Sequence, residues 1–439
     1  MVEHTARPHP VTPRTSPIRR VGVLGAGIMG AGIAAQVADA GLPVVLLDIV
    51  PEGAADRDIL ALDAVDRIRR APTPVATCER ITPANLEDHL PLLAACDWIV
   101  EAVTERIDVK QGLYRAVDAV RKEGSIVSSN TSSFTLARLA ASLPARFTRD
   151  FLLTHFFNPP RHMRLLELVA GPDTRPEATD AIHRFCEERL GKVVVRGRDT
   201  PGGIANRIGT FWLEVGVRRA RDLGLTVEEA DAVAGHPSMG FPRVGLFGLL
   251  DLLSALNDPG APVPPLGAPP DSCRLLEEML RAGRPARGFY RLGRSSRTRE
   301  AIDFATGAYR PVAAPRLASL EAAGRAGLRA LVGHDDRGGR FAWGLLSQTL
   351  TYAASLVPAV AENARSVDLA LHHGFGWAYG PFELLGRLGP AWFRARCAAE
   401  GLDIPPLLRK VGEGVFHRPT VPRNDRRGSL GAAPPIVRR

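Results

Sequence analysis

A glycine-rich turn between two apolar runs near the N-terminus constrains the fold of this chain more than any other feature. Residues 21–24 are apolar, the turn follows, and a helical pattern continues to Ala40 before a second apolar run ends at Asp48. The turn consists of Gly25, Ala26, Gly27, Ile28, Met29 and Gly30. Strand, glycine turn, helix and strand in this order are typical of a dinucleotide-binding βαβ unit. The pattern therefore predicts a parallel sheet that binds a dinucleotide.

Each glycine of the turn is expected at its position for a different physical reason. Gly25 permits the tight turn, Gly27 lets a pyrophosphate approach the backbone, and Gly30 lets the helix pack on the sheet. Amides at the N-terminus of the helix then face the phosphates, because they have no partner within the helix. We therefore expect the cofactor site to include Ile28 and Met29 as well as the glycines.

Asp48 stands at the end of the second apolar run. A carboxylate there can accept hydrogen bonds from the ribose hydroxyls and would repel a 2′-phosphate, so the predicted cofactor is NAD rather than NADP. The alternative is a solvated aspartate at a strand end.

The rest of the first 200 residues alternates strands with helices. Strand-like runs are expected at 98–103, 125–129 and 151–155, and a helical pattern reaches Arg121. This alternation predicts a doubly wound parallel sheet. We assign it to a Rossmann-type domain at residues 18–199.

Long helical patterns replace the strand pattern after residue 200. The first is expected from Asn206 to Leu223, and Thr226-Val-Glu-Glu229 has the spacing of a capping box, which predicts a helix start. Segments 226–230 and 245–250 recur about 135–140 residues later as segments 366–370 and 380–385, and a repeat of this size predicts two related domains. The predicted organisation is α/β plus all-α, with helical domains at 200–292 and 335–417, a linker at 293–334, and flexible tails at 1–17 and 418–439.

The net charge of +9 lies mostly in the tails, which carry +3 in residues 1–20 and +5 in residues 418–439. Because both tails are also rich in proline and lack apolar periodicity, we expect solvated ends and no nucleic-acid partner. The five cysteines contain no Cys-x-x-Cys pair, so neither a metal site nor a disulfide framework is predicted and a cytoplasmic location fits. No run approaches the roughly 18 apolar residues of a membrane span.

His155 and Glu167 are the candidates for acid–base chemistry. Glu167 lies within an apolar run, where an unpaired carboxylate would be costly, so it requires a partner. His155 is one candidate partner. The alternative is a core histidine at 155 and an ion pair between Glu167 and Arg161 or Arg164.

Five ordered motifs together decide between these interpretations. They are Gly25–Gly30, Glu101-Ala-Val-Thr-Glu105, Asn130-Thr-Ser-Ser133, His155-Phe-Phe-Asn-Pro159, and Asp199-Thr-Pro-Gly202 with Asn206. With them the chain, from about Ile18 to about Phe416, resembles the 3-hydroxyacyl-CoA dehydrogenases of fatty-acid β-oxidation. It resembles particularly the dehydrogenase portion of the multifunctional enzymes, in which two related helical domains follow. The resemblance implies NAD-dependent oxidation of (3S)-3-hydroxyacyl-CoA to 3-ketoacyl-CoA.

The resemblance also implies a role for individual residues. His155 would be the general base, Glu167 would orient and charge it, and Ser132 and Asn206 would bind the reacting part of the substrate. The nicotinamide end of the cofactor site would be lined by Glu105, Lys110 and Asn130. These roles fit the chemistry, since an imidazole can take the hydroxyl proton as a hydride leaves C3, and a carboxylate fixes its tautomer.

The sequence departs from the family in three places. One is the proline-rich stretch between Leu253 and Cys273, which is unlike an ordered helical domain and leaves the acyl-binding side of the site undetermined. Gly203 stands where the family usually has a bulky apolar residue, which puts the pose of Asn206 in question. The multifunctional relatives continue into an enoyl-CoA hydratase domain, which we do not expect here. The alternatives are a dehydrogenase of a small 3-hydroxy acid without CoA, and a weakly active NAD-binding scaffold. We expect the chain to form a homodimer or to associate with a separate enoyl-CoA hydratase or thiolase.

Overall fold

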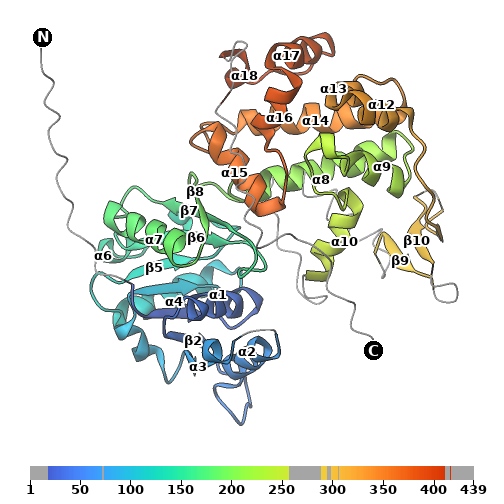
Figure 1. Ribbon diagram of the computed structural model, residues 1–439. Helices are drawn as coiled ribbons and strands as arrows, with labels where there is room; N and C mark the ends of the chain where they lie inside the picture. The colour runs from blue at the N-terminus through green and yellow to red at the C-terminus, as the bar shows by residue number, and fades with distance from the viewer. Residues whose placement is uncertain are drawn as a thin grey trace, which may run out of the picture.

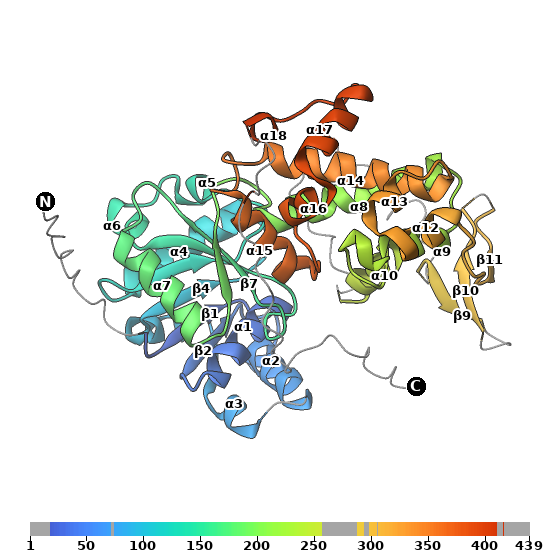
Figure 2. The same ribbon diagram turned by 45° about the horizontal axis from the view of Figure 1, so that its top comes forward.

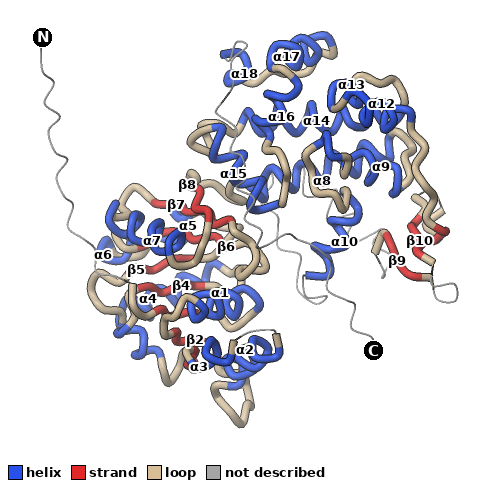
Figure 3. The backbone as a smooth tube through the Cα atoms, viewed as in Figure 1, coloured by secondary structure: helices blue, strands red, loops and turns tan. Residues whose placement is uncertain are grey.

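The computed structural model describes residues 18–71, 74–256, 288–293, 298–304, 306–410 and 416; the predicted tails lie outside these ranges. An eight-stranded sheet with its covering helices forms one body, and a second body is almost entirely helical (Figure 1). Within the described ranges, strands lie in the first body and in a small sheet at the far side of the second (Figure 3). The predicted combination of an α/β domain with an all-α part is therefore confirmed.

The large sheet has the strand order β3-β2-β1-β4-β5-β6-β7-β8. Its strands are β1 (Val21–Leu24), β2 (Val44–Asp48), β3 (Ile81–Asn85), β4 (Trp98–Glu101), β5 (Ile126–Ser129), β6 (Phe151–Phe156), β7 (Leu165–Ala170) and β8 (Val193–Arg196). All neighbouring pairs are parallel except β6 and β7, which are antiparallel. The exception follows from chain length, because residues 157–164 are too few for a crossover and allow only a hairpin-type return.

Helices cover both faces of this sheet. One apolar core packs α1, α2 and α7 on one face, and another packs α4, α5 and α6 on the opposite face. The helices are α1 (Ile28–Asp39), α2 (Ile59–Arg70), α3 (Val75–Glu79), α4 (Ile107–Val120), α5 (Leu136–Ala140), α6 (Ala145–Thr148), α7 (Pro176–Glu188) and the 3-10 helix η1 (Leu90–Ala95). The sheet is therefore doubly wound, as predicted.

The second body begins with α8, the first of a series of helices around one apolar core. The elements are α8 (Ala205–Asp222), α9 (Val227–Ala234), η2 (Pro237–Met239), α10 (Leu246–Leu256), α12 (Ala318–Ala326), α13 (Leu328–Val332), α14 (Arg337–Ser355), α15 (Ala364–Phe375), α16 (Pro381–Leu388), α17 (Pro390–Ala399) and α18 (Pro406–Lys410). Thr226 caps α9 in a capping box with Glu229, as predicted. No helix among the described residues is both long and apolar enough to cross a bilayer.

The two helical repeats share one hydrogen-bonding arrangement, in which an aspartate of one helix binds the amides at the start of the next helix. Asp231 of α9 accepts hydrogen bonds from the amides of Phe247 and Gly248, in the first turn of α10. Asp368 of α15 accepts equivalent bonds from the amides of Phe382 and Glu383, in the first turn of α16.

The equivalence of Asp231 and Asp368 corrects the residue-by-residue alignment of the two repeats that the sequence suggested. The helix N-cap equivalent to Thr226 is Asn363, whose side chain accepts from the amide of Ser366, so Thr226 does not correspond to Ser366. Apolar similarity alone cannot distinguish alignments one helical turn apart, whereas the caps can.

Much of the stretch predicted as a linker is ordered secondary structure. It holds β10 (Arg299–Ile302), which pairs antiparallel with both β9 (Tyr290–Leu292) and β11 (Tyr309–Pro311), and also α12 and α13. These strands have only three or four residues each, too short for an alternating pattern to emerge from an Arg- and Gly-rich segment. The linker interpretation therefore does not describe these residues.

Helix α15 of the second repeat returns to the large sheet and packs against β7 and β8 (Figure 2). Gly374 of α15 has no room for a side chain, because a Cβ there would lie 2.7 Å from Leu165 of β7 and 3.1 Å from Ala205 of α8. The second repeat is thus in contact with the strand that carries Glu167.

Candidate active site

His155 and Glu167 are direct cross-strand neighbours on the antiparallel pair β6 and β7. The imidazole Nδ1 lies 3.2 Å from Oε2 of Glu167, and the two side chains are 12% and 2% exposed. Of the two arginines considered as partners, Arg161 pairs with Asp39 of α1 at 2.7 Å. The ion pair that Glu167 forms is with His155 and not with Arg164. The buried carboxylate is therefore satisfied by the histidine, and the pair is formed by strand register.

The second oxygen of Glu167 is held by the start of α8. Oε1 accepts hydrogen bonds from the amides of Ile204 at 3.0 Å and Ala205 at 2.8 Å. The N-terminus of a helix carries partial positive charge, which stabilises an anion placed there. Because this carboxylate can only accept, His155 donates its Nδ1–H to it, and Nε2 remains as the proton acceptor.

Gly203 is required by the position of Glu167. Its backbone has φ +57°, in the left-handed region, and a Cβ at this position would lie 2.0 Å from Oε2 of Glu167. The departure from the family at this residue therefore has a physical reason in this chain: glycine leaves the space that the carboxylate occupies. A bulky apolar side chain would fit only with a different backbone.

The candidate substrate residues Ser132 and Asn206 and the candidate cofactor residue Asn130 lie on segments that are tied to this pair. Asn130 accepts a hydrogen bond at its Oδ1 from the amide of Phe156, the residue after His155. The carbonyl of Ser132 accepts from the amide of Gly202 at 2.9 Å, which joins the loop after β5 to the loop before α8. Asn206 lies in the first turn of α8, next to the amide of Ala205 that binds Glu167.

A buried charge network lies beside these residues at the end of β4. Lys110 is fully buried and its Nζ lies 2.6 Å from Oε1 of Glu101 and 3.8 Å from Oε1 of Glu105. Glu105 also accepts from the hydroxyl of Thr131 at 2.7 Å, and burial raises the pKa of its carboxyl. Lys110 and Glu105 thus lie together, as the resemblance implies.

Glu101 is a site residue that the sequence reasoning did not select. Its carboxylate accepts from the hydroxyls of Tyr114 at 2.5 Å and Ser129 at 2.6 Å and from the amide of Val103. The same signal that marked Glu167, a carboxylate within an apolar strand, would have identified it.

The glycine turn leaves space for a ligand at one position only. A Cβ on Gly25 would lie 2.6 Å from the carbonyl of Ala102, and one on Gly30 would lie 1.8 Å from the carbonyl of Gly25. A Cβ on Gly27 would meet no atom within 4 Å, so the backbone is open there to an approaching phosphate. The turn therefore fits a dinucleotide pyrophosphate.

Asp48 lies directly beside this turn. Its Oδ2 accepts a hydrogen bond from the amide of Ala26 at 2.5 Å, and the carbonyl of Ala26 accepts from Arg67 of α2 at 2.8 Å. The carboxylate thus holds the glycine turn from the end of β2.

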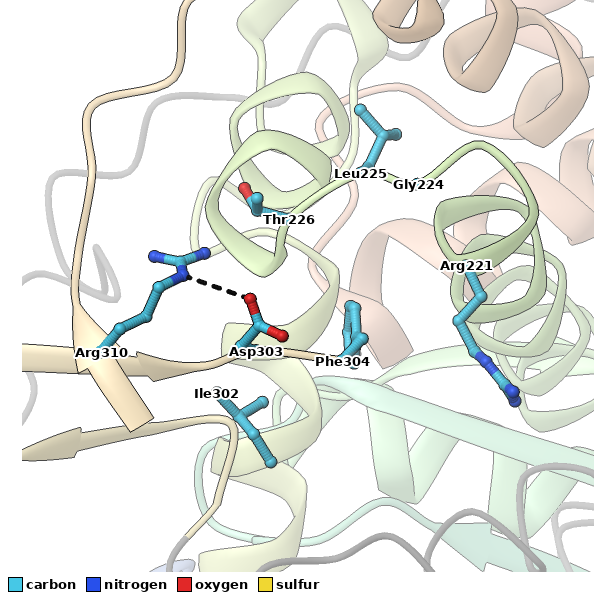
Figure 4. A pocket seen from close by; sticks show the side chains of 8 residues that line it. All are labelled: Arg221, Gly224, Leu225, Thr226, Ile302, Asp303, Phe304 and Arg310. Carbon is cyan, nitrogen blue, oxygen red and sulfur yellow. Dashed lines mark ion pairs between the residues drawn. The ribbon is translucent and has the colours of Figure 1, made fainter. Parts of the chain in front are cut away.

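A separate cavity of about 300 Å³ lies in the helical body, between the start of α9 and the small sheet (Figure 4). Its walls are formed by Arg221, Gly224, Leu225, Thr226, Ile302, Asp303, Phe304 and Arg310. Arg310 is neutralised by Asp303 and Glu228, and the side chain of Arg221 extends away from that pair. None of the candidate catalytic or cofactor residues lines this cavity, so we place the site at the strand ends.

One family model and several known proteins are similar to this chain. The family model for the NAD binding domain of 3-hydroxyacyl-CoA dehydrogenase matches residues 20–200. A Bacillus subtilis (strain 168) protein named "probable 3-hydroxyacyl-CoA dehydrogenase" is 35% identical over 428 residues, covering 90% of this chain and 54% of the relative. A Deinococcus radiodurans protein of the same name is 40% identical over 240 residues, covering 54% of this chain and 69% of the relative.

Among solved structures, 3-hydroxybutyryl-CoA dehydrogenase from Escherichia coli K12 has the same fold. Its TM-score is 0.61 at 22% identity, and the match covers 90% of this chain and 98% of that one. The chain spans about half the length of several relatives that it matches, including the one from Bacillus subtilis.

Proposed function

The chain belongs to the 3-hydroxyacyl-CoA dehydrogenase family, and from this premise we propose that it catalyses the NAD-dependent oxidation of (3S)-3-hydroxyacyl-CoA to 3-ketoacyl-CoA. The observation that carries the proposal is the His155–Glu167 pair, because its carboxylate is held by two amides of α8 while Nε2 of the imidazole is free to take a proton. Such an arrangement is suited to a general base.

In the proposed reaction, Nε2 of His155 removes the proton of the 3-hydroxyl while the C3–H bond breaks and a C3=O bond forms. The proton leaves the substrate for His155, and the hydrogen on C3 leaves with both electrons as a hydride. Glu167 stabilises the resulting imidazolium through its contact with Nδ1. Fixed by α8, this carboxylate needs no reorganisation as the charge develops.

NAD, when bound, supplies the acceptor for that hydride. Gly25, Gly27 and Gly30 would hold its pyrophosphate, together with the first turn of α1, in which Ile28 and Met29 lie. Asp48 would bind the adenine ribose. Glu105, Lys110 and Asn130 would lie toward the nicotinamide, as the resemblance implies.

For the substrate we propose an acyl-CoA thioester, with Ser132 and Asn206 binding its reacting end. We place the reaction in the β-oxidation of fatty acids, in the cytoplasm, by a chain that acts as a homodimer or beside a separate enoyl-CoA hydratase or thiolase. The proposals for the substrate, the pathway and the assembly rest on the resemblance to the family, whereas the proposal of an acid–base pair rests on the geometry of His155 and Glu167.

The deciding experiment is the reverse reaction followed by the loss of NADH absorbance. We expect turnover with acetoacetyl-CoA and a longer 3-ketoacyl-CoA, and none with acetoacetate at the same concentration. Efficient reduction of acetoacetate would favour the small-acid alternative. Absence of turnover with all three substrates, while NADH still binds, would favour the scaffold.

A further inference from the structure

Lys192 is a buried cation that the proposed chemistry does not yet use. It precedes β8 and is only 4% exposed. Among the described residues no carboxylate forms an ion pair with it, and the neighbouring ionisable group is the thiol of Cys186 on α7. A buried ammonium without a counter-ion is costly, so its retention requires compensation from other groups.

That compensation comes from one segment of the chain. Nζ of Lys192 donates to the carbonyl of Pro160 at 2.5 Å and to the carbonyl of Met163 at 2.7 Å. It also lies 5.2 Å from the centre of the Phe156 ring, at cation–π distance. All three partners lie between His155 and Glu167, on the segment that joins the proposed base to its carboxylate.

The same segment is held against the cofactor helix α1. A Cβ on Gly32 of α1 would lie 2.8 Å from the Pro160 ring, so the two are in close contact. Arg161 forms an ion pair with Asp39 at the end of α1. The segment is therefore fixed on one side by the helix whose N-terminus faces the glycine turn, and on the other by Lys192.

A charged donor is suited to this position for a physical reason. Hydrogen bonds from a charged donor are roughly twice as strong as those between neutral groups, and they hold their acceptors more closely. Burial lowers the pKa of Lys192 to about 8, so the ammonium is still the prevailing form at neutral pH. An apolar side chain of similar size could fill the space but would leave two buried carbonyls without a donor.

We propose that Lys192 is a positioning residue of the reaction, which holds segment 156–163 so that His155 stands at the correct distance from both the substrate and the cofactor. The proposal rests on the proposed function, since it assigns Lys192 a part in the same site. Lys192 itself touches neither Glu167 nor His155 in the hydrogen bonds described, so it acts through the backbone between them.

The test compares Lys192→Met with the control Arg175→Met. The control also removes a partly buried cation from the sheet body. Arg175, however, binds Asp150, which lies just before the start of β6, whereas His155 lies near the end of that strand. We expect Lys192→Met to lower kcat for acetoacetyl-CoA reduction by about 10–10²-fold, the range that a displacement near 1 Å can cause. The KM for acetoacetyl-CoA and the Kd for NADH should stay near their wild-type values.

If Lys192→Met does not fold, Lys192→Gln replaces it. Its amide is uncharged and one bond shorter than the lysine side chain, so it cannot hold both carbonyls as closely, and kcat should still fall, though by less than in Lys192→Met. An unchanged kcat in the folded variant would overturn the proposal. So would an equal loss of kcat in Arg175→Met, because the effect would then be one of general stability.

A second readout does not depend on turnover. In NMR spectra of histidine-labelled protein, the ring signals of His155, assigned with His155→Gln, should shift in Lys192→Met and not in Arg175→Met. If the wild-type protein is inactive, the proposed function fails, whereas a shift of these signals would still support the positioning by Lys192. Unshifted signals would overturn it.

Discussion

Replacing Gly203 by alanine should separate backbone strain from damage to the catalytic pair. The residue has φ +57°, where a side chain costs about 1–2 kcal/mol of folding free energy. In addition, its Cβ would lie 2.0 Å from Oε2 of Glu167, whereas carbon and oxygen atoms in contact stand well beyond 3 Å apart. The carboxylate would therefore have to move by on the order of 1 Å.

That displacement would weaken the bond to His155 and the two bonds from the amides of α8. A shift of this size can cost about 10²-fold in rate, so we expect Gly203→Ala to lower kcat by about that factor. The Kd for NADH should be unchanged, since the glycine turn is not involved. The assay is NADH oxidation with acetoacetyl-CoA, together with urea unfolding of each variant.

Gly224→Ala provides the matched control. Gly224 has φ +61°, almost the same backbone conformation, but a Cβ there would meet no atom within 4 Å. Backbone strain should cost each variant about 1–2 kcal/mol of stability. Gly203→Ala should lose more than Gly224→Ala, because its Cβ also displaces the Glu167 carboxylate, and only Gly203→Ala should lose turnover. Equal kcat values for the two folded variants would refute the reasoning, because the steric conflict with Glu167 would then have no consequence.

Three further predictions concern the catalytic pair, the candidate cofactor residue Asp48 and the buried Asp231. His155→Gln should lower kcat by roughly 10²–10⁴-fold with little change in NADH affinity. In the double variant with Glu167→Gln, kcat should fall by much less than the product of the two single effects, because the residues act as a unit. Multiplicative losses of kcat in steady-state kinetics would indicate separate roles. Asp48→Asn should narrow the preference for NADH over NADPH, measured as the ratio of kcat/KM values, and a wild-type enzyme without that preference would contradict the assignment. Burial raises the pKa of Asp231 from 3.8 to about 7, so its neutral form is favoured in the folded state; the stability it contributes is full below pH 3.8 and is lost as the pH rises through about 7. Urea unfolding at pH 5 and pH 8 should show this fall, and Asp231→Asn should reduce it.

The sheet body was predictable because its signals are local. The glycine turn, the apolar runs and the short connections each depend on neighbouring residues, and the strands β1, β2, β4, β5 and β6 lie where the sequence places them. Strand β3 contains Pro83 and Asn85, residue types that are depleted in strands, so its place at the sheet edge had no such signal.

The details of the site depended on distant contacts. Sequence spacing left Glu167 with either a histidine or an arginine as partner, and only the antiparallel register of β6 and β7 decides it. Likewise, Gly203 gave no sign of its role, because the atom that excludes a side chain there belongs to Glu167, far away along the chain. Lys192 was not selected at all, since its partners are backbone carbonyls, which every sequence supplies.

The anchoring of Glu167 joins the two bodies at the site. The carboxylate belongs to the sheet, but the amides of Ile204 and Ala205 that hold it belong to the start of a helix in the other body. Neither body alone therefore contains the complete arrangement: the sheet supplies the imidazole and its carboxylate, and the helical body supplies the donors that fix that carboxylate. A substitution at the start of α8 would act on the base from outside the domain that carries it.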